Sequence, residues 1–352
     1  MNSEYKIFMH TKIVRVEGNL SKISEEFING PVAFPTETVY GLGASVWRED
    51  LIKKVFEIKN RPQDNPLIVH VSSLDMLRKC IAGDIPEIYN ELINEFWPGP
   101  LTLLFKKAAN LPYSVTAGSE YVAVRMPDHK DILRVIDYLG EPIVGPSANK
   151  SGRPSPTTAQ HVFDDLNGDV SLIIDGGVCE KGIESTIVNG ILDTPLLLRA
   201  GAISYEEVKE YIPQLEIHGG SGTADGTIAP GTRYKHYSPT ATVIMITGTK
   251  ETICQKLFTV ASLSKALDKD IVCAESKTAF GFLLPDEYQN IIQSTDMVYL
   301  LGNNTKEAAH RIFDGLRYLD RHVSAIYTVE IEKTKEGRGV MDRLTKATTH
   351  FI

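Results

Sequence analysis

Two short clusters hold side chains suited to binding a phosphorylated ligand. Lys59 and Arg61 end a stretch of helical apolar spacing, just before Pro62. Cations there complement the negative end of a helix dipole, but an arginine also offers a forked donor for phosphate. Ser147 and Asn149 lie in a loop rich in hydroxyl and amide groups. That loop is either ordinary turn chemistry or a site for phosphate or a metal-bound water.

Two more candidates lie within apolar runs that read as strands. Arg125 alternates with apolar residues in YVAVRM, and an arginine in such a strand requires an anionic partner or water. An internal acid and the carboxylate of a ligand would each satisfy it. His70 lies in the run at residues 67–71. A single strand histidine is more often structural than a ligand, and its role stays open between proton acceptor and substrate contact.

Hydroxyl groups and another arginine lie at the ends of further predicted strands. Thr38 follows the strand predicted at residues 31–34, in PTETVYGL. Ser185 begins the predicted strand at 185–188, in ESTIV, and Arg199 ends the next one. Ligands of open α/β sheets bind beyond the carboxyl ends of strands, and functional residues concentrate in loops. Each cluster alone is weak evidence, but together they predict a site.

The elements that position these residues form an α/β pattern in the first two-thirds of the chain. Short runs rich in Val and Ile, bounded by Gly, Pro and Asn, predict strands. Stretches of helical apolar spacing lie between them, which predicts a sheet covered by helices. The predicted strands span 31–34, 67–71, 101–105, 121–126, 142–144, 172–174, 185–188 and 196–199, and the predicted helices 49–59, 86–96 and 157–166.

A second α/β pattern follows a segment rich in Gly, Thr and Ser. We therefore predict a first domain over residues 1–217, a linker over 218–240 and a small domain over 241–352. Alternation of strands and helices in the last part is typical of a parallel, Rossmann-like sheet. Its predicted strands span 242–246, 271–274, 297–301 and 325–329, and its predicted helices 249–267, 305–322 and 339–346.

Composition and missing motifs exclude several classes of protein. The formal net charge of -8 argues against a broad nucleic-acid-binding surface. The sequence contains neither a Walker A loop nor G-x-G-x-x-G, and its four cysteines form no C-x-x-C pair. It contains no signal-peptide pattern and no apolar run long enough to span a membrane. We therefore expect a cytoplasmic protein that does not bind membranes.

The motifs together resemble a known family. PTETVYGL, KNRPxxxPL, VAVRMP, GPSANxSG and ESTIV occur in the order and spacing of the YrdC-type threonylcarbamoyl-AMP synthases, and PGTRYKHYSP with the following region resembles their long, two-domain form. The resemblance implies a twisted mixed sheet with helices, followed by a small Rossmann-like parallel sheet. It also implies a hallmark catalytic set of Lys59, Arg61, Ser147 and Asn149, all present here.

The resemblance further implies two subsites and a lid. The residues implied to surround L-threonine are Thr38, His70, Arg125 and Ser185. Those implied to bind ATP are Lys59, Arg61, Asn65, Tyr121, Ser147, Asn149, Ser155, Arg199 and Tyr234. The linker is expected to fold over the site as a lid that carries Tyr234.

The implied reaction converts L-threonine, bicarbonate or CO2, and ATP into threonylcarbamoyl-AMP and pyrophosphate. Mg²⁺ is expected to accompany ATP, with no metal site in the protein itself. The product would be the first intermediate of tRNA threonylcarbamoyladenosine formation at the adenosine 3′ of the anticodon. A separate machinery is expected to transfer the group, and tRNA binding by this chain should be weak or absent. The alternatives are a non-enzymatic RNA-binding module and a carbamoyltransferase-type YrdC domain; the acidic charge and the lack of C-x-x-C pairs weigh against them.

Overall fold

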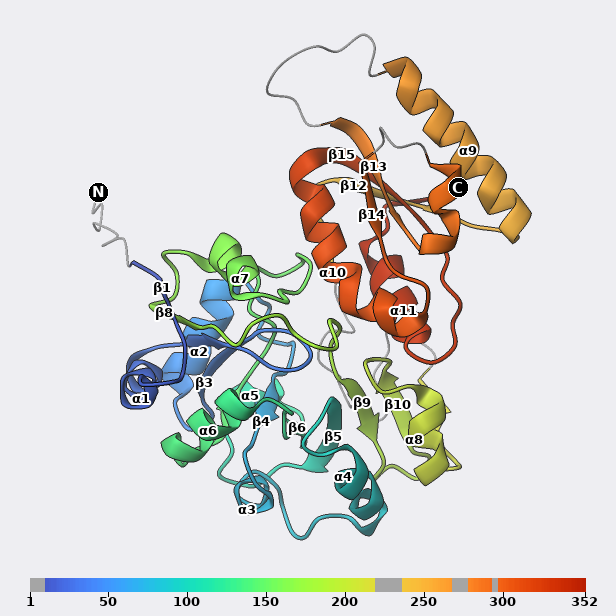
Figure 1. The fold of residues 1–352 in the computed structure, drawn as a ribbon. Coiled ribbons are helices and arrows are strands. Elements are labelled where there is room, and N and C mark those ends of the chain that lie inside the picture. The colour runs from blue at the N-terminus through green and yellow to red at the C-terminus, as the bar shows by residue number, and fades with distance from the viewer. Residues whose placement is uncertain (1–9, 219–235, 268–277, 293–296) are drawn as a thin grey trace.

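The chain forms two sheets, each covered by helices. The computed structural model describes residues 10–218, 236–267, 278–292 and 297–352. In these residues an eleven-stranded sheet precedes a separate five-stranded sheet (Figure 1). The predicted fold class is therefore confirmed. The predicted domain boundaries stay a prediction, because most of the expected linker and lid, including Tyr234, lies outside the described residues.

The larger sheet is mixed and its central strands are buried. Its strands run in the order β1-β8-β2-β3-β7-β4-β6-β5-β9-β10-β11. Parallel pairs such as β4 with β6 lie beside antiparallel pairs such as β5 with β6. The strands are β1 Lys12–Val14, β2 Val32–Phe34, β3 Gly41–Ser45, β4 Ile68–His70, β5 Leu101–Lys106, β6 Tyr121–Arg125, β7 Ile143–Val144, β8 Leu172–Ile174, β9 Thr186–Asn189, β10 Leu196–Arg199 and β11 Glu216–Ile217.

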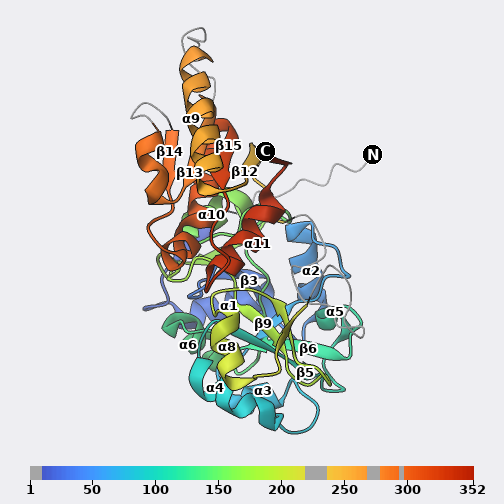
Figure 2. The same ribbon diagram turned by 90° about the vertical axis from the view of Figure 1, so that its right-hand side faces the viewer.

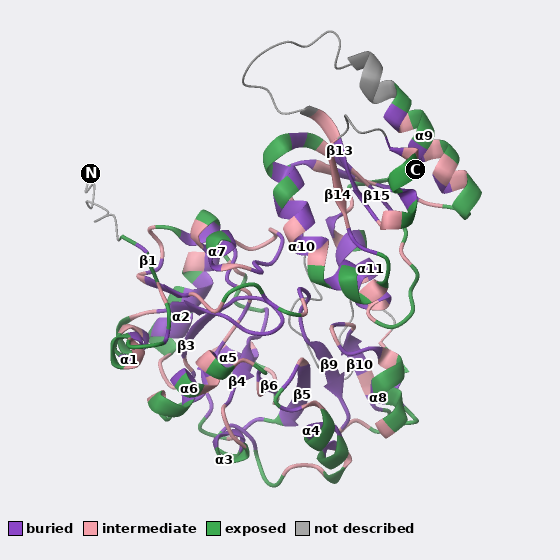
Figure 3. Ribbon diagram, viewed as in Figure 1, coloured by how far each residue is buried: buried purple, intermediate pink, exposed green. Residues whose placement is uncertain are grey.

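Amphipathic helices surround this sheet, with their outer faces exposed (Figure 3). Helix α2 spans Glu49–Lys59, as predicted, and buries Leu51, Val55 and other apolar residues of one face. The other helical segments are α1 Leu20–Asn29, α3 Leu74–Arg78, η1 Glu87–Tyr89, α4 Asn90–Phe96, α5 Tyr113–Thr116, α6 Lys130–Leu139, α7 Ala159–Leu166 and α8 Tyr205–Tyr211.

The smaller sheet is entirely parallel in the described residues, as its alternating pattern predicts. Its strands run in the order β14-β13-β15-β12-β16. The strand predicted at 271–274 lies outside the described residues, whereas β13 was not predicted. The elements are β12 Thr242–Ile246, α9 Lys250–Leu267, β13 Thr278–Leu284, η2 Asp286–Ile291, β14 Met297–Leu300, α10 Thr305–His322, β15 Val323–Val329, α11 Gly337–Ala347 and β16 His350–Phe351.

Helices α10 and α11 lie between the two sheets, whereas α9 lies on the outer side of the small sheet (Figures 1 and 2). Val39 and Ile183 of the larger unit belong to the same buried apolar cluster as Leu316 of α10 and Val340 of α11. The two units are thus joined by a continuous apolar contact. Within the described residues, no helix is long and apolar enough to cross a membrane.

Candidate active site

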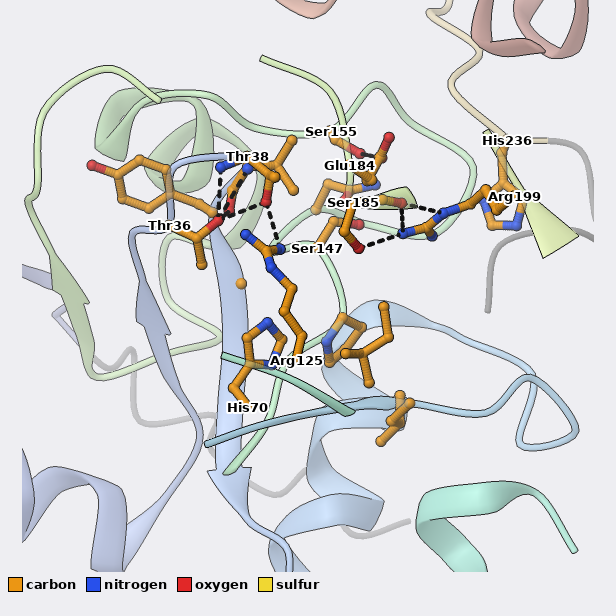
Figure 4. Close-up of a pocket in the computed structure, with 18 of the residues that line it drawn as sticks. Thr36, Thr38, His70, Arg125, Ser147, Ser155, Glu184, Ser185, Arg199 and His236 are labelled. Atoms are coloured by element: carbon orange, nitrogen blue, oxygen red, sulfur yellow. Dashed lines mark hydrogen bonds between the residues drawn. The ribbon is translucent and has the colours of Figure 1, made fainter. Parts of the chain in front are cut away.

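A polar pocket lies between the larger sheet and the segment that leads into the smaller unit (Figure 4). Its cavity volume is about 60 Å³. Nine of the residues predicted for the site line it: Thr38, Arg61, His70, Arg125, Ser147, Asn149, Ser155, Ser185 and Arg199. Lys59, Asn65 and Tyr121 are not among the lining residues, and Tyr234 lies outside the described part of the chain.

Arg125 is buried at the end of β6, and its contacts are to other residues of the same chain. Its Nη2 lies 2.5 Å from a carboxylate oxygen of Glu37. Its Nη1 donates to the Thr38 hydroxyl at 2.8 Å, and its Nε donates to the Gly99 carbonyl at 3.0 Å. An internal acid therefore pairs with the arginine by charge, although Nη2 makes no hydrogen bond among the described residues. Because Arg125 also lines the pocket (Figure 4), its pre-set guanidinium can still meet a ligand anion there.

His70 lies directly beside Arg125, because the register of β4 and β6 pairs these two residues. Its side chain is buried, and its Nδ1 has no hydrogen-bond partner among the described residues. Burial, reinforced by the charge of Arg125, lowers the pKa of His70 to about 3. The imidazole is therefore neutral at physiological pH.

Lys59 supports the site from behind. Its side chain is only 1% exposed, and its Nζ donates to the backbone carbonyls of Ser147 and Asn149. Burial lowers the pKa of Lys59 well below its ordinary value. By these two hydrogen bonds, the amine nitrogen of Lys59 fixes the loop that presents Ser147 and Asn149 to the pocket. In this structure it is a positioning group and does not face the cavity.

Arg61 reaches the pocket because the chain turns sharply after α2. Asn60 ends the helix in a left-handed conformation with φ 52°. Arg61 then curls back, and its guanidinium donates to the carbonyls of Pro66 at 2.9 Å and Asn65 at 3.2 Å. Asn65 is thus a support for Arg61. Tyr121 instead packs against the apolar cluster that contains Ile68.

Asn149 presents an unpaired oxygen to this part of the pocket. Its Nδ2 donates to the carbonyls of Lys150 at 2.8 Å and Arg153 at 2.9 Å. Its Oδ1 is buried without a hydrogen-bond partner among the described residues. The oxygen is therefore available to a ligand donor or to a metal-bound water.

The opposite side of the pocket is built by β9 and β10. Arg199 donates from Nη2 to the backbone carbonyl of Ser185 at 2.9 Å and to its hydroxyl at 3.1 Å (Figure 4). The Ser185 hydroxyl also contacts that of Thr102 at 2.7 Å. Close by, the Ser155 hydroxyl donates to the Glu184 carboxylate at 2.6 Å. The predicted Ser185, Arg199 and Ser155 are thus brought together.

Several lining residues were not predicted for the site. They are Thr36, Arg153, Glu184, His236 and Tyr237, together with apolar and backbone contacts. Each lies in or next to a motif that indicated the site: three in the quoted loop and strand motifs, and two in the aromatic, basic end of the linker. Burial, and then the charge of Arg61, lowers the pKa of His236 to about 4.

The pocket is locally positive in an acidic chain. Among the described residues, four arginines line it, namely Arg61, Arg125, Arg153 and Arg199, and one carboxylate, Glu184. Across the described residues, no group of three or more His, Cys, Asp or Glu side chains could hold a metal ion. The arrangement suits a ligand that carries several negative charges.

Comparison with known proteins identifies the family. A family model described as telomere recombination (Sua5/YciO/YrdC) matches residues 28–201, and one described as the C-terminal domain of threonylcarbamoyl-AMP synthase matches residues 203–349. Threonylcarbamoyl-AMP synthase of Pyrococcus abyssi is 40% identical, over 91% of each chain. That of Bacillus subtilis is 39% identical, over 91% of this chain and 89% of its own. This chain belongs to the threonylcarbamoyl-AMP synthase family.

A solved structure of this family extends the similarity to three dimensions. The crystal structure of Pyrococcus abyssi Sua5 complexed with L-threonine superposes with a TM-score of 0.86 at 37% sequence identity. The match covers 97% of this chain and 99% of that one. Both units of the fold are therefore those of a threonylcarbamoyl-AMP synthase.

Proposed function

We propose that this chain is an L-threonylcarbamoyladenylate synthase, which converts L-threonine, bicarbonate or CO2, and ATP into threonylcarbamoyl-AMP and pyrophosphate. The observation that carries the proposal is a single pocket with two differently built ends. One end joins a buried arginine to hydroxyls and a neutral imidazole, and the other gathers arginines around the loop of Ser147 and Asn149. The relatives from Pyrococcus abyssi and Bacillus subtilis, which align along most of their length, are both named threonylcarbamoyl-AMP synthase.

The first end suits an amino acid. The guanidinium of Arg125 can bind a carboxylate, and Glu37 and Thr38 hold it in one orientation. The His70 imidazole adds a hydrogen-bonding group of no net charge, and the Ser185 hydroxyl, which accepts from Arg199, lies where the two ends meet. Because the pKa of His70 is about 3, we assign it a contact to the substrate, since so weak a base abstracts protons poorly.

The second end suits ATP. Arg61 and Arg199 are placed to neutralise phosphate charge, Ser147 offers a hydroxyl group, and Ser155 offers a hydroxyl oxygen whose proton is donated to Glu184. Mg²⁺ would arrive with ATP as part of the substrate. The Oδ1 of Asn149, buried without a partner among the described residues, fits a water of that hydrated ion.

The chemistry requires two anions to meet. The neutral amine of threonine adds to CO2 and gives up one proton to water, which leaves a carbamate anion; a carbamate oxygen then attacks the α-phosphorus, and pyrophosphate leaves. The positive pocket lowers the repulsion between the anions, while Lys59 keeps the loop in place. Positioning and electrostatic stabilisation therefore supply the catalysis, and no covalent enzyme intermediate is required.

The product is an activated carbamoyl group, so its use requires a second reaction. We place this chain at the first step of tRNA threonylcarbamoyladenosine formation, in the cytoplasm. A separate tRNA-binding transferase would then deliver the group to the adenosine 3′ of the anticodon. The net charge of -8 supports this assignment, because a chain without a basic excess is not expected to bind the tRNA itself.

Pyrophosphate release tests the proposal. With folded protein, Mg²⁺ and ATP, release should require both L-threonine and bicarbonate, and Arg61→Ala should reduce it by about a hundredfold, as loss of a positioned charge at a reacting phosphate does. Release that ignores threonine, or none under any combination, would remove the synthase assignment.

A further inference from the structure

Helix α11 of the smaller unit brings a buried arginine to the wall of the pocket. Arg343 is 0% exposed, and its Nε donates to Glu184 of the larger unit at 3.0 Å. Its Nη1 donates to the Ala200 carbonyl, next to Arg199. The helix approaches closely here because it has glycine at 339, where an added Cβ would lie 3.1 Å from the Gly201 carbonyl oxygen.

The Glu184 carboxylate bridges Arg343 and the pocket. One of its oxygens accepts from Arg343, and the other accepts from the Ser155 hydroxyl at 2.6 Å. Burial opposes ionisation of this carboxyl group, but the charges of Arg343 and Arg199 outweigh it and lower its pKa. Ser155 therefore has its proton committed to an anion, and its lone pairs remain for the pocket.

Arg343 also lies against a second lining residue, Tyr237. Its guanidinium carbon is 5.7 Å from the centre of the Tyr237 ring. That ring is buried, and its centroid lies 5.2 Å from the ring centroid of Phe313 in α10. Tyr237 adopts a left-handed backbone with φ 63°, which a non-glycine residue keeps only when its surroundings hold it.

We infer that Arg343 is a positioning residue through which the smaller unit completes the ATP end of the pocket. It orients Ser155 by way of Glu184, and it fixes the Tyr237 ring directly. The inference rests on the proposed function, because it assigns these residues to nucleotide binding. It gives the C-terminal unit a role in the synthase reaction itself.

The chain offers a matched control on the same helix. Arg338 of α11 also pairs with an acid of the larger unit, Glu206, at 3.3 Å. That pair is partly exposed and does not line the pocket. Arg338→Met therefore removes a contact between the two units without touching the site.

Steady-state pyrophosphate release, measured separately against ATP and threonine, tests the inference. Arg343→Met should raise the KM for ATP by about tenfold, as loss of a buried charged partner does, and change the KM for threonine less than about twofold. Arg343→Lys should recover part of the loss, and Arg338→Met should match the wild type. If the folded Arg343→Met protein has the same KM values for ATP and threonine as Arg338→Met, the inference is overturned.

A second variant protects the test against misfolding. Arg343→Met leaves the buried Glu184 without its partner, whereas Glu184→Gln with Arg343→Met removes both charges and should fold. The double variant should still bind ATP about tenfold more weakly in calorimetry; unchanged binding would overturn the inference.

A wild-type protein that binds ATP but releases no pyrophosphate would instead contradict the proposed function, and ATP binding by the variants would still decide the role of Arg343.

Discussion

At the residue scale, the buried pair of His70 and Arg125 sets the character of the end of the pocket that we propose binds threonine. The two side chains lie at paired positions of β4 and β6. The guanidinium is held by Glu37 and Thr38, and its charge helps to keep the imidazole neutral. An uncharged histidine next to a pre-oriented arginine can recognise a zwitterionic amino acid without adding repulsion to its ammonium group.

The neutral state of His70 makes stability depend on pH. Its pKa is about 3 when folded and near 6.5 when unfolded, so the unfolded chain binds the proton more readily. The contribution of neutral His70 to the free energy of unfolding is fully present above the pKa of the unfolded state. It is lost as the pH falls below that pKa, by roughly 2 kcal/mol between pH 7 and pH 5. Urea denaturation of wild type and His70→Asn at both pH values checks this, and an equal pH dependence in the two proteins would show that His70 is not buried and neutral.

Lys59 acts through the loop that it holds. Lys59→Met leaves the carbonyls of Ser147 and Asn149 without their donor, so the loop should shift. We expect kcat to fall by about a hundredfold, as a displacement of catalytic groups by about 1 Å does, while threonine binding in calorimetry stays within about twofold of wild type. Turnover at the wild-type rate would show that the loop keeps its place without the ammonium group.

At the scale of elements, two long helices and several short apolar strands such as β8 were predictable, whereas the amphipathic helices α1 and α6 and the strand β3 were missed. Helix α2 and helix α10 have the predicted bounds, because their apolar residues recur at helical spacing over several turns. Strand β3 was missed because its sequence, GLGAS, has glycine where strands usually have branched residues. Those glycines are required, since a Cβ at 41 or 43 would overlap the Phe34 ring.

The site could be predicted from its motifs only in part. Nine predicted residues line one pocket, because most of them end or follow strands of the same sheet, while Arg61 follows helix α2 and Ser185 precedes β9. Lys59 was predicted as a phosphate ligand, but its side chain lies behind the loop. Nor could spacing reveal Arg343, which comes from a helix more than a hundred residues beyond the last catalytic motif. Only the packing of α11 against Glu184 shows it.

Helices α7 and α10 are joined by a buried ion pair that should contribute to stability. Arg317 lies 2.7 Å from Asp165, with side chains 3% and 1% exposed. Arg317→Met would leave a buried carboxylate, so the free energy of unfolding in urea should fall by about 3 kcal/mol. Asp165→Asn combined with Arg317→Met should regain most of this loss, and equal losses in the single and double variants would show that the pair is not the cause.

At the scale of the whole molecule, the pocket that we propose as the active site lies where the two units meet. The larger sheet supplies most lining residues, and α11 of the smaller unit supports one wall. A joint apolar cluster and several ion pairs hold this arrangement. The two units should therefore unfold as one under conditions that preserve the interface.

The acidic net charge predicts that this chain does not bind tRNA tightly. With a net charge of -8, the chain lacks the cationic excess that drives backbone binding. Fluorescence anisotropy at physiological salt should give a Kd for tRNA weaker than about 10 µM. Tight binding that weakens steeply with salt would favour the RNA-binding alternative.

Direct detection of the product tests the central claim, that one pocket joins threonine to the adenylate of ATP through a carbamate. The protein would be incubated with ATP, Mg²⁺, L-threonine and carbon-13-labelled bicarbonate, and the mixture separated for mass spectrometry. We predict a threonylcarbamoyl-AMP peak that carries the label and is lost in Arg61→Ala. An unlabelled adenylate of threonine, or no adenylate from protein shown to be folded, would contradict the account.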